Sequence, residues 1–161
     1  MKSSHSSAAT FAAFDDPNLL AYGGLAPAVR LAERCGLPGL VRARVRLDEA
    51  GNGAGAAPDA KVMSLVAAML AGAESIDDTD VLRHGAMRRA FTGMHAPSTL
   101  GSFLRAFTWG HVRQLQSAAR VFTCQLSGHC NLLPGSDQVV YLDIDSKVKQ
   151  VYGAMKNELR A

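Results

Sequence analysis

Residues 96–107 read Ala-Pro-Ser-Thr-Leu-Gly-Ser-Phe-Leu-Arg-Ala-Phe, and they carry a strong signal for the start of a helix. Proline and small hydroxyl residues are typical of helix entry, and Ser98 is the expected N-cap. Four apolar residues then follow at spacings of three and four, which predicts one buried helical face. These residues are Leu100, Phe103, Leu104 and Phe107. The stretch therefore places a core helix near the middle of a helical region.

A longer helix is expected immediately downstream, over about residues 111–126. Trp109-Gly110 is interpreted as a bend before it. The Trp109 ring could stack on a base, but packing between two helices is the favoured interpretation. The apolar face of this helix repeats at helical spacing. The residues expected to be buried on it are Leu115, Ala118, Ala119 and Phe122.

Upstream, the same reasoning predicts helices over about residues 27–35, 40–47, 58–71 and 78–83. Gly36 is the expected stop of the first, and Pro38 prevents its continuation. The glycine-rich residues 51–55 form the best candidate for a linker. The helix over 58–71 is predicted to bury a stripe made of Val62, Leu65, Val66, Met69 and Leu70.

The pattern changes after residue 131, where residues 138–144 alternate as a strand does. Residues 148–152 are expected to return as its antiparallel partner. Asp143 and Asp145 would project to one face, roughly 7 Å apart at about 3.3 Å of rise per residue. Paired carboxylates of this kind can hold Mg²⁺ for phosphoryl transfer. An exposed strand face with two solvated aspartates explains the same residues, so both readings stay open.

Composition sets broad limits on the 161-residue chain. Hydrophobic residues make up 48%, enough for a folded core, and the net charge is +3 with a pI of about 8.9. That mild excess permits a nucleic-acid partner without requiring one. Cys35, Cys124 and Cys130 match neither a disulfide framework nor a zinc site, and they are expected to be reduced and mostly buried. No targeting or membrane-spanning segment is evident, so a cytoplasmic, nucleoid-associated location is expected.

Seven blocks, spread in order from about Phe11 to Gly153, resemble the opening of bacterial insertion-sequence transposases of the DDE group. They are Phe14-Asp-Asp-Pro-Asn-Leu, Gly24-Leu-Ala-Pro with Leu31-Ala-Glu-Arg-Cys-Gly-Leu, Gly72-Ala-Glu-Ser-Ile-Asp-Asp, Leu82-Arg-His-Gly, Ala96-Pro-Ser-Thr-Leu-Gly-Ser-Phe-Leu-Arg, Gly110-His-Val-Arg-Gln-Leu and Asp143-Ile-Asp-Ser-Lys-Val-Lys-Gln-Val-Tyr-Gly.

The resemblance implies a mainly α fold: a helical DNA-binding domain followed by the first β-hairpin of a ribonuclease-H-like core. Residues 1–10 are expected to be a disordered tail, 11–131 the helical domain and 132–161 the start of the catalytic domain. Asp145, directly before Ser146, is the implied first acidic ligand for Mg²⁺, in preference to Asp143. Lys147 stands where many members carry threonine. The later acidic ligands are not in the chain, so DNA binding without cutting and joining is expected.

For the DNA contact, the helices near residues 62–71, 78–83 and 98–107 are expected to form a helix-turn-helix-like unit, with the last in the major groove. The implied partners are the element's terminal repeats, and the chain itself or full-length transposase. Two other functions remain open: a helical protein-interaction module that could regulate transposition, and a residual Mg²⁺-dependent nuclease. The residues expected to contact DNA are Thr99, Ser102, Arg105, Arg113, Arg120, Lys147 and Lys149.

Overall fold

The computed structural model describes residues 16–47, 53–130 and 139. This part of the chain contains seven helical segments. In chain order they are α1 (Leu25–Arg34), α2 (Leu37–Arg44), α3 (Pro58–Leu70), the 3-10 helix η1 (Asp77–Arg83), α4 (Met87–Ala90), α5 (Pro97–Arg105) and α6 (Trp109–His129). The mainly α expectation is confirmed. The predicted hairpin over residues 138–152 lies outside the described residues except for Val139, and the described part contains no strand.

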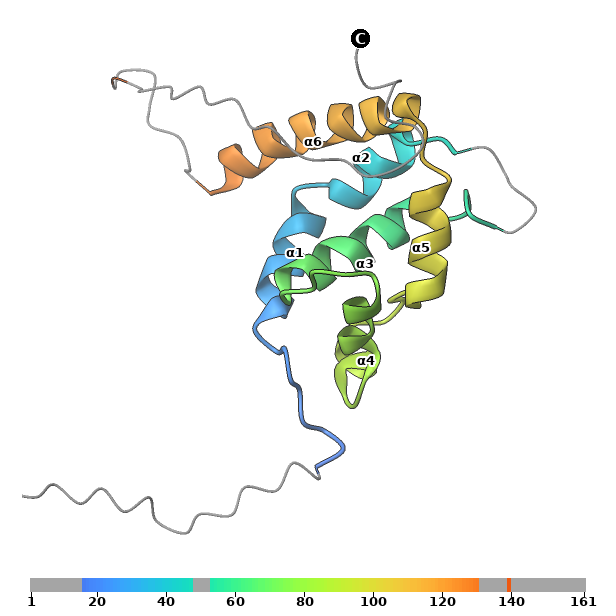
Figure 1. Cartoon of the computed structure of the whole chain (residues 1–161). Helices are drawn as coiled ribbons and strands as arrows, with labels where there is room; N and C mark the ends of the chain where they lie inside the picture. Colours follow the sequence, from blue (N-terminus) through green and yellow to red (C-terminus); the bar gives the residue numbers. More distant parts are fainter. Residues whose placement is uncertain (1–15, 48–52, 131–138, 140–161) are drawn as a thin grey trace, which may run out of the picture.

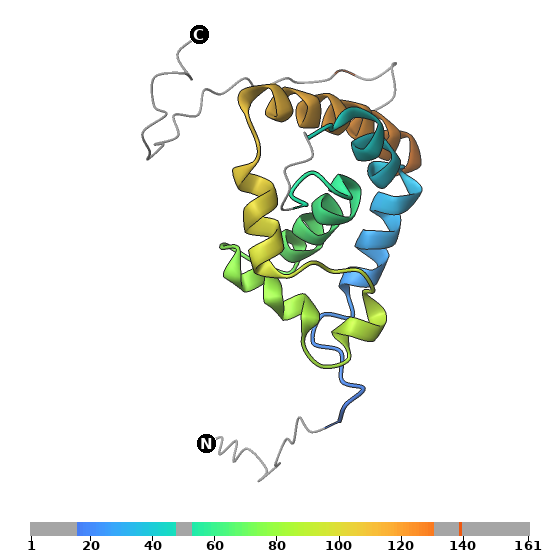
Figure 2. The same cartoon turned by 90° about the vertical axis from the view of Figure 1, so that its right-hand side faces the viewer.

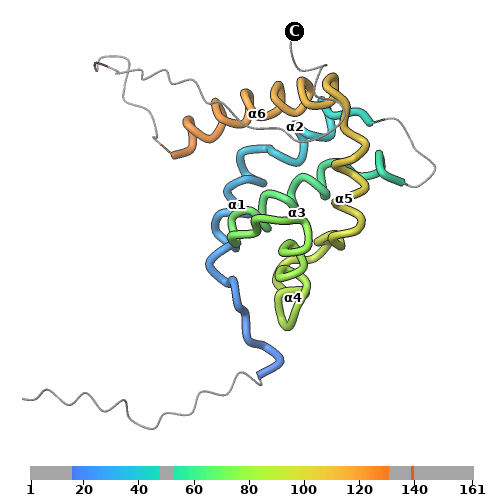
Figure 3. Tube along the Cα trace, viewed as in Figure 1, coloured from blue at the N-terminus to red at the C-terminus, as the bar shows by residue number. Residues whose placement is uncertain are grey.

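Helix α3 lies at the centre of the fold. It packs against α1, α2, η1 and α5, while α6 crosses over α2. Figure 1 shows α6 lying above α2 and α3, and in Figure 2 the other helices surround α3. The short connection between α5 and α6 turns the chain sharply, so these two helices run in different directions (Figure 3). No helix in the described part combines the length and hydropathy that a bilayer span needs.

The core consists of apolar side chains on the helices that surround α3, and these side chains point toward α3. Leu100 and Phe103 of α5 are fully buried, as the residue 96–107 pattern predicted. Ala67 and Ala68 of α3 are also fully buried, and their small side chains let neighbouring helices approach closely. Cys35 is buried as expected, whereas Cys124 is exposed, contrary to the expectation for the cysteines.

The junction between α1 and α2 depends on Gly36. Its φ of 72° is left-handed, which favours glycine because it has no Cβ, and it ends α1 where the sequence predicted. Pro38 does more than block the first helix, because it occupies the first turn of α2, where a missing N–H is tolerated. Helix α2 therefore begins three residues earlier than the 40–47 pattern indicated.

The expected buried stripe of α3 is wrong at its C-terminal end. Met69 is 70% exposed and Leu70 is 53% exposed, so neither belongs to the core. Lys61 is buried instead: its Nζ donates to the carbonyl oxygens of Gly53 and Ala54, at 2.9 and 3.0 Å. These bonds satisfy the buried ammonium, although burial lowers the pKa of Lys61.

Two expectations about α5 and α6 also need correction. The N-cap of α5 is Ala96, so Ser98 lies inside the helix. Trp109 is the first residue of α6 and is 55% exposed, so no bend separates it from the helix and its ring is not packed between helices. Ala118 alone is fully buried on α6, and Ala119 is exposed. Leu115 and Phe122 are partly buried against the core.

Candidate nucleic-acid interface

The three helices expected to form a helix-turn-helix-like unit, α3, η1 and α5, do contact one another. The predicted DNA-contacting residues of α5 are less open than expected. Thr99 and Ser102 are half-buried and only Arg105 is exposed. The Arg105 guanidinium donates to the Ser102 hydroxyl at 3.3 Å, so part of its hydrogen-bonding capacity is used within the helix.

Carboxylates lie beside this face of α5. Asp77 and Asp80 line the same open hollow, of about 720 Å³, as Ser98, Gly101 and Arg105. Arg83 donates to Asp80 at 2.7 Å, and this hydrogen bond lowers the pKa of Asp80. Asp80 therefore stays ionised at neutral pH. Arg83 lines the same hollow, so two carboxylates and two guanidinium groups share it, and a DNA phosphate that approached α5 would meet little net positive charge.

The neighbouring loop fixes another carboxylate. Asp78 accepts hydrogen bonds from the backbone N–H and the hydroxyl of Ser75, at 2.8 and 2.7 Å. These bonds lower the pKa of Asp78. Residues 74–80 thus hold most of the acidic side chains of the described part, and they lie on the α5 side of the fold.

Helix α6 has the opposite character. Its 21 residues include Arg113 and Arg120 but no aspartate or glutamate. Both arginines are exposed, and Gln116 between them is exposed as well. Trp109, Arg113, Gln116 and Arg120 follow one another at intervals of four, three and four residues, which aligns them on one side of a helix with 3.6 residues per turn. We call this the α6 stripe; Ala118, the buried residue, lies on the opposite side.

Arg42, Arg44 and Arg46 lie on α2 and just after it, and α2 packs against α6. The backbone N–H of Arg46 donates to Oε1 of Gln114 at 2.8 Å, which ties the end of α2 to α6. Arg42 forms an ion pair with Asp59 of α3. Burial raises the pKa of Asp59, but the hydrogen bond and charge of Arg42 outweigh this and hold it below its ordinary value. Arg44 is half-buried and has no carboxylate on its own helix.

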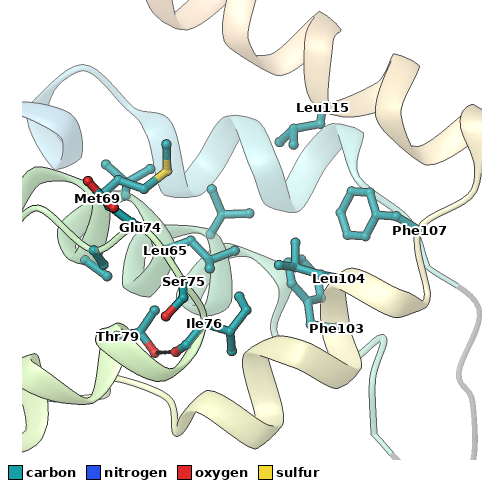
Figure 4. A pocket seen from close by; sticks show the side chains of 14 residues that line it. Leu65, Met69, Glu74, Ser75, Ile76, Thr79, Phe103, Leu104, Phe107 and Leu115 are labelled. Carbon is teal, nitrogen blue, oxygen red and sulfur yellow. Dashed lines mark hydrogen bonds between the residues drawn. The ribbon is translucent and has the colours of Figure 1, made fainter. Parts of the chain in front are cut away.

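An apolar groove of about 550 Å³ lies between α3, α5, α6 and residues 73–79. Figure 4 shows Leu65 and Met69 facing Phe103, Leu104, Phe107 and Leu115 across it. Its hydroxyl groups are already bonded: Thr79 donates to the Ile76 carbonyl at 2.6 Å, and Ser75 donates to Asp78. Neither hydroxyl group that lines the groove is activated as a nucleophile, so the groove suits apolar contact better than catalysis.

The described residues contain no cluster of three or more His, Cys, Asp or Glu side chains that could hold a metal ion. Asp143, Asp145, Lys147 and Lys149, which carried the Mg²⁺ and part of the DNA predictions, lie outside the described residues. The histidines have separate local roles. His84 lies 2.9 Å from Asp80, and His111 receives a hydrogen bond from the backbone of Thr108.

No family model, curated protein or solved structure matches the chain.

The sequence singled out Arg113 and Arg120, and the structure aligns them on one exposed face. It did not single out Arg42, Arg44 or Arg46 as DNA-contacting residues, and it expected Trp109 to pack between helices. One signal was available: α2 and α6 carry arginines and no carboxylates, whereas four of the seven acidic residues of the described part lie at 74–80.

Proposed function

We propose that this helical domain binds double-stranded DNA by laying α6 along the phosphate backbone. One observation carries the proposal: α6 carries the exposed arginines Arg113 and Arg120 on one side and has no acidic side chain. Phosphate contacts depend on such local charge rather than on net charge. A net charge of +3 is therefore sufficient for DNA binding if the positive groups share one face.

Helix α6 supports this function better than α5. Helix α5 has nine residues, of which Leu100, Gly101 and Phe103 are buried, and its exposed side adjoins Asp77 and Asp80. A recognition helix needs several free side chains and room for two phosphate strands. Helix α6 extends over 21 residues and buries only Ala118 completely. Its length of about 30 Å at 1.5 Å per residue is enough to cross a groove and both adjacent backbones.

The ordered sequence blocks extend the proposal to a biological setting. They resemble insertion-sequence transposases, which cut and join DNA with Mg²⁺, so the DNA we propose is an element's terminal repeat. Asp145, or Asp143, would supply the first acidic ligand. In this proposal the helical domain holds the DNA and contributes no chemistry of its own.

The test measures affinity for a fluorescent duplex over a salt series with the full chain. Each phosphate contact contributes about 0.9 to the slope of log K against log salt. Arg113→Gln with Arg120→Gln should lower the slope by roughly two and weaken binding about tenfold or more at low salt. Arg30→Gln is the matched control, because Arg30 is exposed on α1 and lines a hollow with Ala90 and Thr92, away from α6.

Wild-type and double-variant proteins with the same salt slope would exclude the α6 interface. Loss of the slope in the Arg30→Gln control would show that the contact is diffuse and not confined to α6. A sequence preference for terminal-repeat DNA over a scrambled duplex would support the transposase setting.

A second candidate function is self-association through the apolar groove. Met69, 70% exposed, and Leu104, 41% exposed, project beside a hollow of about 550 Å³. A two-fold interface needs such self-complementarity, with a projection of each copy filling the hollow of the other. Sedimentation equilibrium of wild type and Met69→Lys tests it: a dimer that the substitution dissociates supports it, and a monomeric wild type excludes it.

A further inference from the structure

The chain's single tryptophan lies on the surface at the start of the α6 stripe. Trp109 is 55% exposed, although a large aromatic ring gains most from burial. It begins α6 directly after the N-cap Thr108. Trp109 lies on the side of α6 that also carries Arg113, Gln116 and Arg120. An aromatic ring and two guanidinium groups therefore share one row.

The position of Trp109 is anchored to the core by a chain of contacts. Phe103 is fully buried, and its ring meets Phe107 edge-on at 4.9 Å between centroids. Phe107 in turn meets the His111 ring at 5.9 Å. His111 accepts a hydrogen bond of 3.0 Å from the backbone N–H of Thr108 through Nδ1, as part of a capping box. The first turn of α6, and with it the backbone of Trp109, is thereby held in place.

We propose that Trp109 stacks on an unpaired DNA base while Arg113, one turn further along α6, contacts a phosphate of the same strand. This inference rests on the proposed DNA-binding function and refines the class of DNA that the surface takes. Inside a duplex both faces of a base are covered by its neighbours, and a blunt end exposes only the outer face of its last base pair. Bases with both faces open are found in single-stranded DNA, at a frayed end or in an overhang. Stacking on an aromatic ring is independent of base identity.

The arrangement is what such a ligand requires. Four helical residues advance about 6 Å along the axis, which lets a ring and a guanidinium reach one nucleotide and the next. Gln116 and Arg120 continue along the same face and can follow the strand into the adjoining duplex. Asp77 and Asp80 line a hollow beside α5, and α6 itself carries no acidic side chain. The preferred ligand is therefore a junction of duplex and unpaired DNA.

The experiment uses the intrinsic fluorescence of the full chain, because one tryptophan makes the signal specific to Trp109. The protein is titrated with three DNAs of equal length: a blunt duplex, the same duplex with a short thymidine overhang, and a thymidine single strand. Stacking should quench the emission with the second and third DNAs and leave it little changed with the first. Anisotropy of a labelled overhang duplex gives the affinity in parallel.

Trp109→Leu should weaken binding to the overhang duplex about tenfold and leave binding to the blunt duplex unchanged. Trp109→Phe should restore part of the loss, because it keeps a smaller aromatic face. Met69→Leu is the control, since it changes another exposed apolar residue that lies outside the stripe. Far-UV circular dichroism checks that each variant is folded.

Equal affinity of Trp109→Leu and wild type for the overhang duplex would overturn the inference, and so would unquenched emission at saturation. In either case the arginine-dependent salt slope for the blunt duplex would leave the proposed function standing. If the wild-type chain binds none of the three DNAs at low salt, both proposals fail together.

Discussion

Replacing Phe103 by alanine should destabilise the protein far more than the same change at its neighbour Leu104. The sequence pattern assigns both residues to one buried face, but the structure separates them. Phe103 is fully buried, whereas Leu104 is 41% exposed and borders the groove. The pair therefore tests the rotation of α5 about its own axis, on which the positions of the groove and of the anchor for Trp109 depend.

The magnitude for Phe103 follows from its contacts. Removing a buried phenylalanine ring costs about 3–5 kcal/mol. The upper part of this range is expected, because the ring also meets Phe107 edge-on and lies 5.5 Å from the ammonium of Lys61. Leu104→Ala removes partly hydrated surface and introduces a better helix former, so it should cost less than about 1 kcal/mol. The expected difference is about 3 kcal/mol.

Urea unfolding followed by far-UV circular dichroism measures both changes. With a slope of about 2 kcal/mol per molar urea, Phe103→Ala should lower the midpoint by roughly 2 M and Leu104→Ala by less than about 0.5 M. Phe103→Leu keeps most of the apolar volume and should cost about 1–2 kcal/mol, which provides a measurable value if the alanine variant does not fold. Equal costs for alanine at positions 103 and 104 would mean that α5 is rotated from the orientation described.

Three further results are expected. Lys61→Met removes both hydrogen bonds to the carbonyls of Gly53 and Ala54 but also removes a buried charge, so it should lower the free energy of unfolding by about 1–3 kcal/mol. Mass spectrometry should detect faster amide hydrogen exchange, chiefly over residues 53–61. Burial, and then the charge of Lys61, lower the pKa of His95. Because the unfolded chain binds this proton at a higher pH than the folded chain, stability should fall as the pH drops below the ordinary histidine pKa. The urea midpoint of His95→Asn should depend less on pH than that of the wild type. Chelation of divalent ions should change duplex affinity less than about twofold in anisotropy titrations, because guanidinium–phosphate contacts need no metal.

The helix positions could be predicted because their signals are local. Gly36 supplies the left-handed residue that ends α1, and Pro58 occupies the first turn of α3, as the sequence indicated. Leu100 and Phe103 are buried together because three residues nearly complete one helical turn. The two helix boundaries do not depend on how the helices pack, whereas the burial of Leu100 and Phe103 does, as the exposure of Leu104 on the same predicted face shows.

The buried side of α3 could not be predicted in the same way. Apolar periodicity favoured Met69 and Leu70 as core residues and gave no reason to bury Lys61. Lys61 is buried because the carbonyls of residues 53 and 54 return over α3 and accept its hydrogen bonds, and Met69 is exposed because no helix covers the end of the groove. Both outcomes are set by tertiary contacts that a periodicity of 3.6 residues does not contain.

The same limit applies to the candidate interface. Charge along the sequence identified Arg113 and Arg120, but the backbone N–H of Arg46 reaches α6 through a hydrogen bond to Gln114, 68 residues away. The surroundings of Arg105 are likewise non-local, since it shares a hollow with Asp77, Asp80 and Arg83 of η1. The charge pattern of a single helix does not contain such contacts.

Helix α6 serves two purposes on opposite sides, and this division restricts what it can bind. Ala118 is buried on the inner side, while the row from Trp109 to Arg120 faces outward without contributing to the core. Trp109 is 55% exposed and therefore gains only part of the energy that full burial of its ring would give, and arginines at a surface add little stability. A partner with stacked rings and regularly spaced negative charge satisfies both kinds of side chain at once. Nucleic acid combines these properties, which is why we propose it as the partner of the outer side of α6.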